Sequence, residues 1–213
     1  MTATALSGFA PRKTPIQPRA TVTVGAISEA TIQVLLKQGV NRLTTTRVAE
    51  RAGVSVGTLY QYYPNKQSLL FAALADHLDR VATAVEAACE QARHKPLSDM
   101  VRAVVEAFVD AKLERIDISA ALYQIAADVG GPALAKRVGQ RSRKALAALF
   151  ETAPDISAPP DTFVIEMMFA AMSGATRYVL EAGAAPAMVR RLRQQLVVLC
   201  QSYMDAQQRP PAP

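Results

Sequence analysis

The chain has 213 residues, of which 50% are apolar and 20% charged, with two cysteines, no tryptophan and a formal net charge of +6. This composition predicts one large domain or two small ones with a real core, and it excludes a disordered or collagen-like chain. Two cysteines are too few for a disulfide scaffold, and no uncharged apolar run reaches the roughly 18 residues of a membrane span. The first residues also lack the pattern of a secretory signal, so we expect a soluble cytoplasmic protein that does not act at a membrane.

The positive charge is concentrated at one end of the chain. Residues 1–66 hold eight basic and two acidic side chains, whereas residues 67–213 hold sixteen of each. A local basic excess on an otherwise neutral chain indicates contact with a polyanion such as DNA. The alternative is a surplus that arose by chance, and charge alone does not separate the two.

Helical spacing dominates the pattern between the two ends of the chain. Residues 1–20 mix prolines with small polar residues and predict a flexible, basic arm, and residues 207–213 predict a disordered tail. In between, apolar residues recur three and four positions apart, and prolines and glycines separate the stripes. We therefore predict an all-α fold of about nine helices, with three in a domain at 21–66 and six in a domain at 67–206.

In the first domain, the residues that can begin and end helices are spaced as in a helix-turn-helix. A helix at 21–38 is followed by Gly39, which can supply a left-handed stop. Thr44 is a suitable cap for a second helix that ends at Gly53, and Ser55 is a suitable cap for a third that Pro64 stops. In such a motif the first of the two short helices braces the second, which enters the major groove of DNA.

The second domain is predicted from longer apolar stripes. Its helices are expected at about 66–93, 97–115, 118–129, 133–152, 161–182 and 187–206. The last two each carry an apolar stripe that would be buried if they met their copies in a second chain. The alternative is that both stripes pack on the core of their own subunit.

Side chains suited to DNA gather around the two short helices. Those whose hydroxyl or ammonium group can reach a phosphate are Thr44, Thr45, Thr58, Tyr60, Tyr62 and Lys66. Arg47 can pair with a guanine edge if it faces the groove. Val56 and Gly57 carry no strong hydrogen-bonding group, so they predict close backbone approach and contact with thymine methyl groups.

One segment closely resembles the DNA-binding domain of the TetR family of transcriptional regulators. It runs from Gly39 to Leu70 and reads GVNRLTTTRVAERAGVSVGTLYQYYPNKQSLL. The resemblance implies phosphate contacts at Thr45, Thr58, Tyr60, Tyr62 and Lys66, and base or backbone contacts from Thr46, Arg47, Val56 and Gly57. One departure is Tyr63, where the family usually has phenylalanine. That position packs inward, so the change adds a hydroxyl that needs a partner.

The resemblance also implies what the rest of the chain does. Members of this family dimerise and bind a small molecule through their C-terminal part, usually with the last two helices forming a four-helix bundle. We therefore expect a homodimeric repressor, paired through helices near 161–182 and 187–206, that a small, partly apolar effector releases from palindromic double-stranded DNA. Residues suited to line the effector cavity are Phe108, Tyr123, Met168, Phe169 and Met172, although such residues more often belong to a plain core.

Two other functions compete with this interpretation. One is a DNA-binding regulator that responds to no ligand or is gated by a partner protein. The other is an enzyme, which we do not expect, because the sequence has no glycine-rich phosphate loop, nucleophile elbow or trusted metal-ligand spacing. We accordingly expect no catalytic residue, no metal and no cofactor. The basic run of Lys136, Arg137, Arg141, Arg143 and Lys144 is expected to be a solvated face, with an acidic partner as the alternative.

Overall fold

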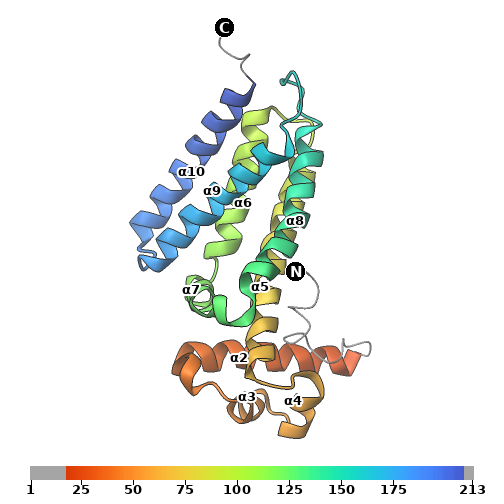
Figure 1. The fold of residues 1–213 in the computed structure, drawn as a ribbon, viewed down its shortest axis with the longest axis vertical. Coiled ribbons are helices and arrows are strands. Elements are labelled where there is room, and N and C mark those ends of the chain that lie inside the picture. Colours follow the sequence, from red (N-terminus) through yellow and green to blue (C-terminus); the bar gives the residue numbers. More distant parts are fainter. Residues whose placement is uncertain (1–17, 209–213) are drawn as a thin grey trace. The chain divides into compact units, whose positions relative to one another are not determined.

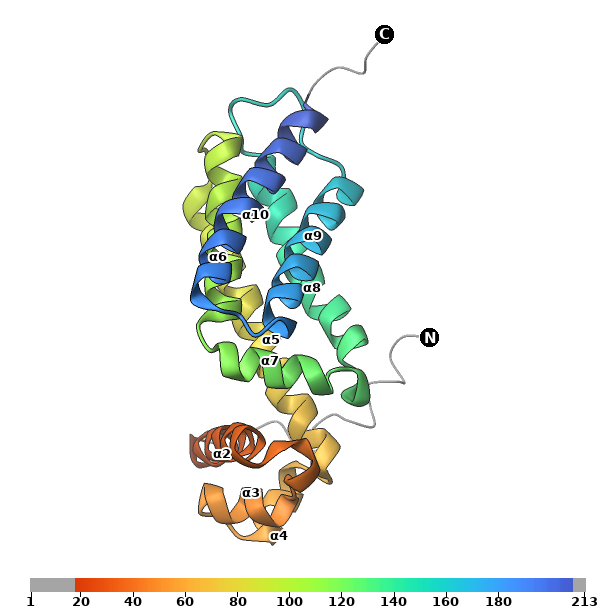
Figure 2. The same ribbon diagram turned by 90° about the vertical axis from the view of Figure 1, so that its left-hand side faces the viewer.

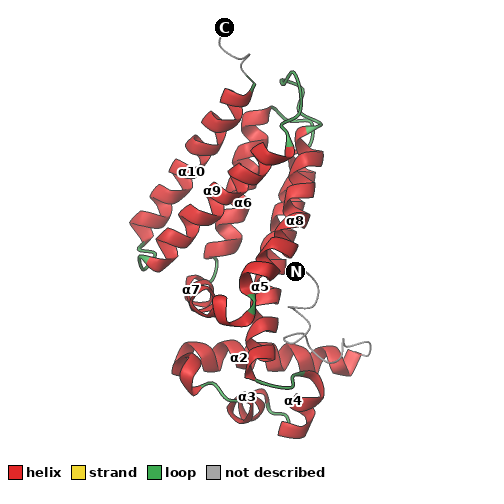
Figure 3. Cartoon of the chain, in the orientation of Figure 1, coloured by secondary structure: helices red, strands yellow, loops and turns green. Residues whose placement is uncertain are grey.

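The computed structural model describes residues 18–208, and every regular element among them is a helix (Figure 1; Figure 3). With the labels of Figure 1, the α-helices are α2 (Pro18–Arg42), α3 (Thr45–Ala52), α4 (Val56–Tyr62), α5 (Lys66–Ala92), α6 (Leu97–Leu113), α7 (Ile116–Ile125), α8 (Gly131–Phe150), α9 (Thr162–Glu181) and α10 (Pro186–Gln207). A short 3₁₀ turn, η1 (Ala127–Val129), precedes α8. The prediction of an all-α fold with nine helices is confirmed for the part of the chain described.

The ends of the helices differ from the prediction at both termini. α2 begins at Pro18, so the expected arm at 1–20 is wrong for its last three residues. Proline is favoured in the first helical turn, where its missing N–H has no partner to lose. α10 includes Gln207, which was assigned to the tail. The remainder of the arm and tail, residues 1–17 and 209–213, lies outside the described residues.

Two other boundaries follow from glycine. The helix of α2 is interrupted at Gly39, whose φ of 74° and ψ of 168° are open to glycine alone, so the expected break falls at the expected residue. The helix predicted at 118–129 is instead α7 followed by η1, and Gly130 closes this segment with a φ of 72°.

The chain divides into two compact units. Unit 1 holds residues 1–78 and 117–136, and unit 2 holds residues 79–116 and 137–213. Helices α5 and α8 each run from one unit into the other. Unit 1 is therefore larger than the DNA-binding domain expected at 21–66, because it also takes in the start of α5 and all but the first residue of α7.

The core of unit 1 forms where α3 packs against both α2 and α4. Ile27 and Leu35 of α2, Val48 of α3 and Leu59 of α4 are all buried. Leu43, the residue before the cap Thr44 of α3, is buried as well. This packing fixes the relative position of the two short helices.

In unit 2, α6 packs against both α9 and α10, which lie side by side (Figure 2). The buried faces include Val104 and Phe108 of α6, Met172 of α9, and Leu196 and Met204 of α10. Polar links hold the same helices together, since Gln201 donates to the Ser98 carbonyl at 2.8 Å and Arg193 pairs with Asp110. α9 is the one described helix long and apolar enough to cross a membrane by length and composition, a test that core helices also pass, and one of its faces is buried in this unit.

Gly131, at the start of α8, marks a close approach that only glycine permits. A Cβ there would lie 2.5 Å from the carbonyl oxygen of Ala126, which already accepts the Gly131 amide at 2.7 Å. We expect Gly131→Ala to lower the free energy of unfolding by about 1–3 kcal/mol, measured by chemical denaturation. Gly25→Ala is the matched control, because a Cβ on that exposed α2 residue meets nothing within 4 Å and should raise stability by up to about 1 kcal/mol. Equal stability of the two variants would contradict this prediction.

Candidate nucleic-acid interface and effector residues

Two side-chain caps hold the short helices of unit 1 in place. The amide of Arg47 donates to Thr44 Oγ1 at 3.3 Å at the start of α3, and the amide of Thr58 donates to Ser55 Oγ at 3.0 Å at the start of α4. Between the helices Gly53 takes the left-handed conformation, with φ of 67°. These are the caps and the stop expected from the sequence, and together they aim the first turn of α4 outward from the core.

The structure brings several of the expected phosphate-binding hydroxyls together. Thr45 Oγ1 lies 3.1 Å from Tyr60 Oη, so the start of α3 and the middle of α4 share one hydrogen bond. Thr58 Oγ1 lies 2.8 Å from Ser55 Oγ. Tyr60 is 43% exposed even though its ring is large and apolar. An exposed aromatic ring with its hydroxyl next to that of a threonine is well placed to contact a phosphate.

The first turn of α4 exposes backbone. Gly57 is exposed and has ordinary helical geometry, and a Cβ at this residue would meet only Ser55 Oγ, at 3.8 Å. Neither the fold nor the packing of the free chain therefore requires glycine at this position. Val56 is half-buried beside it, and Thr46 of α3 is exposed. The glycine leaves room for another molecule to approach the helix closely.

Arg47 and Lys66 are held at the end of α2. Arg47 Nη1 donates to the carbonyl of Arg42 at 2.7 Å, and Lys66 Nζ donates to the carbonyl of Val40. Both cations donate to carbonyl groups in the last turn of the helix, where a positive charge is favourable. To contact DNA, each would have to give up or share such a bond.

Arg47 also lines an open, polar groove between α2 and α3. Its volume is about 450 Å³, and its walls are Gln33, Val34, Lys37, Gln38, Arg47, Glu50 and Arg51. A chain of hydrogen bonds crosses this groove, from Arg51 to Gln33 and from Gln33 to Glu29. Sequence reasoning did not find this groove, because it depends on how two helices pack.

Tyr63 is buried at the end of α4, as the sequence led us to expect. Burial raises the pKa of its phenol, and the carboxylate of Asp76 on α5 raises the pKa further. Tyr62, which precedes Tyr63 and is one of the expected phosphate ligands, is half-buried.

The expected effector residues divide between the two units. Phe108, Met168 and Met172 are fully buried in unit 2, and Phe169 is half-buried there. The rings of Phe108 and Phe169 meet edge to face, with centroids 5.6 Å apart and an interplanar angle of 72°. Tyr123 lies on α7 in unit 1, so the structure does not group it with the other four.

Unit 2 also buries polar residues that the sequence did not point out. Lys112 of α6 is only 4% exposed, and burial lowers its pKa to about 8. Thr176 of α9 is fully buried, and its hydroxyl has no hydrogen-bond partner. Helical spacing could have predicted their burial. Lys112 lies four residues after Phe108, and Thr176 lies four after Met172, so each continues an apolar face.

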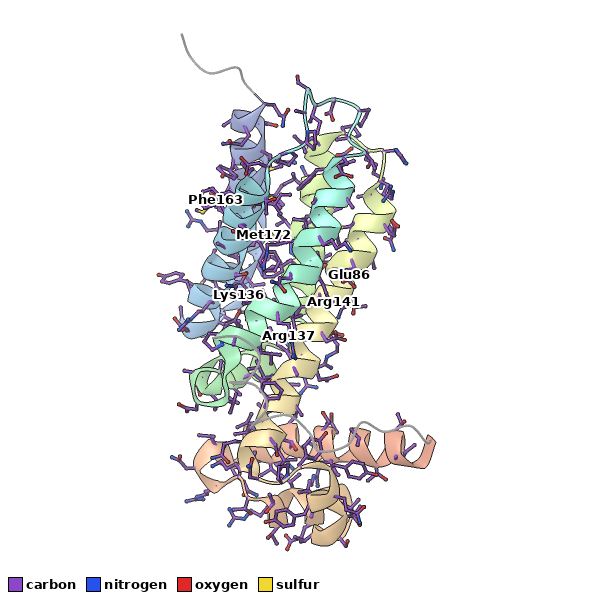
Figure 4. The ribbon with its side chains drawn as sticks, turned by 45° about the vertical axis from the view of Figure 1, so that its right-hand side comes forward. Glu86, Lys136, Arg137, Arg141, Phe163 and Met172 are labelled. Carbon is purple, nitrogen blue, oxygen red and sulfur yellow. The ribbon has the colours of Figure 1, made fainter. Side chains whose placement is uncertain are left out.

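Part of the basic run on α8 is neutralised inside unit 2. Arg141 binds Glu86 through both carboxylate oxygens, at 2.9 and 2.7 Å, and also contacts Asp79 (Figure 4). Arg143 lies 3.9 Å from Glu166 and 5.9 Å from the centre of the Phe169 ring. These pairs leave less of the run available to an acidic partner, as expected for a solvated face.

Large apolar side chains are exposed on α9 and α10. Of the seven that are exposed among the described residues, five lie on these two helices: Phe163, Met167, Tyr178, Val198 and Leu199. Figure 4 shows Phe163 on the outer side of α9, whereas Met172 lies among the helices. Ala170 and Gly174 are also exposed on α9, at helical spacing from Met167 and Tyr178. The five large apolar residues on α9 and α10, together with Ala170 and Gly174, are called the α9–α10 patch.

Nothing in the described residues resembles a metal or thiol site. No three histidine, cysteine or acidic side chains are grouped so that they could hold a metal ion within residues 18–208. Both cysteines are buried, which raises the pKa of Cys89 to about 12 and that of Cys200 to about 11, so neither is activated as a nucleophile.

Two family models match successive parts of the chain. The model of bacterial regulatory proteins of the tetR family matches residues 27–73, and the model of the tetracyclin repressor-like C-terminal domain matches residues 96–204. The chain therefore belongs to the TetR family of DNA-binding transcriptional regulators, which are not enzymes.

Relatives with similar sequences match short stretches of the chain. The transcriptional repressor KstR of Rhodococcus jostii is 46% identical over 55 residues, and the nucleoid occlusion factor SlmA of Haemophilus ducreyi is 45% identical over 47 residues. These matches cover 26% and 22% of this chain, and only 26% and 23% of the two relatives. The chain therefore matches about a quarter of the length of these relatives.

Solved structures share the fold over most of the chain. The fatty acid degradation regulator FadR from Bacillus halodurans has a TM-score of 0.66 at 17% identity, covering 86% of this chain and 97% of its own. The regulator LfrR from Mycobacterium smegmatis, solved in complex with proflavine, has a TM-score of 0.55 at 22% identity, covering 84% and 96%. At these identities the likeness establishes the fold alone.

Proposed function

We propose that this protein is a homodimeric cytoplasmic repressor that binds a palindromic operator and is released from it by a small, partly apolar effector. The observation that carries the proposal is the exposed first turn of α4, where Gly57 has no role in the fold and lies beside the linked hydroxyls of Thr45 and Tyr60. The name of KstR, a repressor with 46% identity over 55 residues, supports repression.

In this proposal α4 enters the major groove. Thr44, Thr45, Thr58, Tyr60, Tyr62 and Lys66 bind phosphates on both sides of the groove, which positions the helix without selecting a sequence. Val56 and Gly57 bring backbone and a methyl-bearing side chain against the base edges, and Thr46 and Arg47 reach them from α3. Arg47 does so by exchanging its bond with the Arg42 carbonyl for one with a base.

The α9–α10 patch is the proposed dimer interface. Phe163 and Tyr178 are each 66% exposed, and Met167 is 44% exposed, so a single chain leaves a long apolar face in water. Gly174 lies in the middle of this face, and a Cβ there would meet nothing within 4 Å. Glycine in a helix costs stability, and its benefit here is close approach of another helix. A second copy covers the patch in the same way on both chains, as two-fold symmetry requires.

Effector release follows from a change in the spacing of the two recognition helices. Two-fold-related α4 helices fit successive major grooves about 34 Å apart. An effector that prefers a conformation with another spacing lowers the population that can bind DNA, by an amount limited to its differential affinity. α5 begins at Lys66 beside the DNA-binding helices and continues into unit 2, so it is the natural connection. The proflavine complex of LfrR supports small-molecule binding by this fold.

Fluorescence anisotropy of the full chain tests this proposal. The probe is DNA from immediately upstream of the protein's own gene, compared with random DNA at two salt concentrations. We expect salt-sensitive binding with a strong preference for the upstream DNA, on the order of 1,000-fold. Tyr60→Phe should weaken binding to both DNAs to a similar degree, whereas Arg47→Ala should alter the preference between them.

Three results would count against parts of the proposal. Weak binding without preference, also in a genome-wide selection of bound fragments, would leave only non-specific phosphate contact. Equal effects of Arg47→Ala on both DNAs would remove its base-reading role. Selective binding that no compound relieves would favour the ligand-independent or partner-gated regulator instead.

A further inference from the structure

We propose that the effector carries an anionic group on an otherwise apolar body, and that Lys112 of α6 and Thr176 of α9 recognise that group within unit 2. This inference rests on the proposed function, because it names the chemical class of the effector. The side chains involved lie on α6, α8 and α9 and are buried or half-buried.

An aromatic contact places the two residues. Phe108 and Phe169 join α6 to α9, and Lys112 follows Phe108 by one helical turn while Thr176 follows Phe169 by two. At about 1.5 Å per residue these steps are roughly 6 and 10 Å along each helix. The two helices run in the same direction from this contact (Figure 1; Figure 2). Lys112 and Thr176 therefore lie toward the same end of unit 2, beyond a wall of apolar rings and methionines.

The hydroxyl of Thr176 is unusual for a helix. A buried threonine normally donates to the carbonyl four residues earlier, as Thr31 of α2 does to Ile27 at 2.7 Å. Thr176 is fully buried, and its hydroxyl makes no hydrogen bond. An unsatisfied buried hydroxyl destabilises the folded chain, and a valine of the same shape would avoid that penalty. A ligand atom that bonds to this hydroxyl would explain why a threonine is kept here.

Lys112 supplies the charge. Its ammonium is almost fully withdrawn from water, and the resulting fall of its pKa to about 8 records the cost of keeping a cation there. A methionine would fill the same space without that cost. An anion brought next to the ammonium is attracted far more strongly in the interior than it would be at the surface.

The surrounding charges favour the same sign of ligand. Arg143 lies over the Phe169 ring with its side chain 19% exposed, so a second cation borders the aromatic pair. Two acidic groups on α6 and α9 are paired with arginines, Asp110 with Arg193 and Glu166 with Arg143. Met168 and Met172, on the same helix as Phe169, can adapt their shape to an apolar body. A cationic effector would meet like charge from Lys112.

The test compares two fluorescent probes that differ only in their charge. 8-Anilinonaphthalene-1-sulfonate is anionic, and N-phenyl-1-naphthylamine has the same rings without the sulfonate. We expect the full-length protein to bind the anionic probe more tightly, by about tenfold or more. Lys112→Met should remove most of that difference, by weakening the anionic probe about tenfold and leaving the neutral probe unchanged. Thr176→Val should weaken the anionic probe by a smaller factor.

Matched variants control for charge and folding. Lys144→Met removes the same charge from an exposed position of α8 and should change neither affinity. Thr176→Val should leave the melting temperature unchanged or raise it, whereas Thr31→Val, which breaks an existing bond, should lower it. Equal binding of the two probes by the native protein, or an equal loss of both in Lys112→Met, would overturn the inference.

DNA binding measured on the same samples separates the two proposals. We expect Lys112→Met to bind the upstream DNA as the native protein does, and the anionic probe to weaken that binding in the native protein but not in the variant. Selective DNA binding without discrimination between the probes would overturn the effector class and leave the regulator. If the protein discriminates between the probes but binds no DNA selectively, the proposed repressor function is overturned and the proposed anion-binding site at Lys112 and Thr176 is retained.

Discussion

Replacing Gly57 by alanine is expected to weaken operator binding by about 10- to 100-fold while leaving the protein at least as stable as before. In the free chain a Cβ at this residue meets only Ser55 Oγ, at an ordinary contact distance of 3.8 Å. Alanine is the better helix former by up to about 1 kcal/mol, so α4 should gain stability. The added methyl group would fill the space that the bases need next to the backbone of α4.

Two measurements on one preparation decide this prediction. Thermal unfolding reports the stability of the variant, and anisotropy with the upstream DNA reports its affinity. Gly25→Ala is the matched control, because Gly25 is also an exposed helical glycine with nothing within 4 Å, and it should raise stability without changing affinity. Native operator affinity in Gly57→Ala would mean that the first turn of α4 does not approach DNA closely.

Replacing Gly174 by leucine should convert the proposed dimer into monomers without unfolding the chain. The fold tolerates the side chain because a Cβ at Gly174 projects into open space, and leucine favours the helix. Packed helices lie about 8–10 Å apart, and the closest crossings need small residues at the contact, so leucine would push the two copies of α9 apart. A monomer presents one recognition helix, and operator affinity should fall by a factor on the order of 100.

Sedimentation of the purified variant checks this prediction directly, since it distinguishes the mass of one chain from that of two. Ala148→Leu adds the same side chain to an exposed position of α8, away from the patch, and should remain dimeric and bind the operator normally. If Gly174→Leu sediments as a dimer with native operator affinity, the α9–α10 patch does not pair the subunits.

The contrast between these two glycines and Gly131 shows what the sequence could predict and what it could not. All three lie in helical segments. A Cβ at Gly131 would clash with the Ala126 carbonyl, whereas a Cβ at Gly57 would make one ordinary contact and a Cβ at Gly174 would meet nothing within 4 Å. Glycine in a helix lowers the stability of the helix, which suggests that close approach of other atoms compensates. Only the neighbouring atoms show whether those atoms belong to the same chain or to another molecule.

The local elements followed from the sequence alone. The caps at Thr44 and Ser55, the turn at Gly53 and the break at Gly39 all depend on interactions within a few residues, so their signals are complete in a short segment. The same local chemistry identified the hydroxyls of α3 and α4 as candidates for phosphate binding. The beginning of α2 was missed because Pro18 serves equally well in an arm and in the first turn of a helix.

Tertiary structure decided the direction and burial of individual side chains. Met167 and Met168 are neighbours in one apolar stretch, yet the first is 44% exposed and the second is 1% exposed. Arg47 and Lys66 turn toward the end of α2 because the carbonyls of its last turn accept hydrogen bonds from them. Lys112 and Thr176 are buried because α6 and α9 pack within unit 2. Helical periodicity establishes which residues share a face, but what covers that face depends on segments far away in the chain.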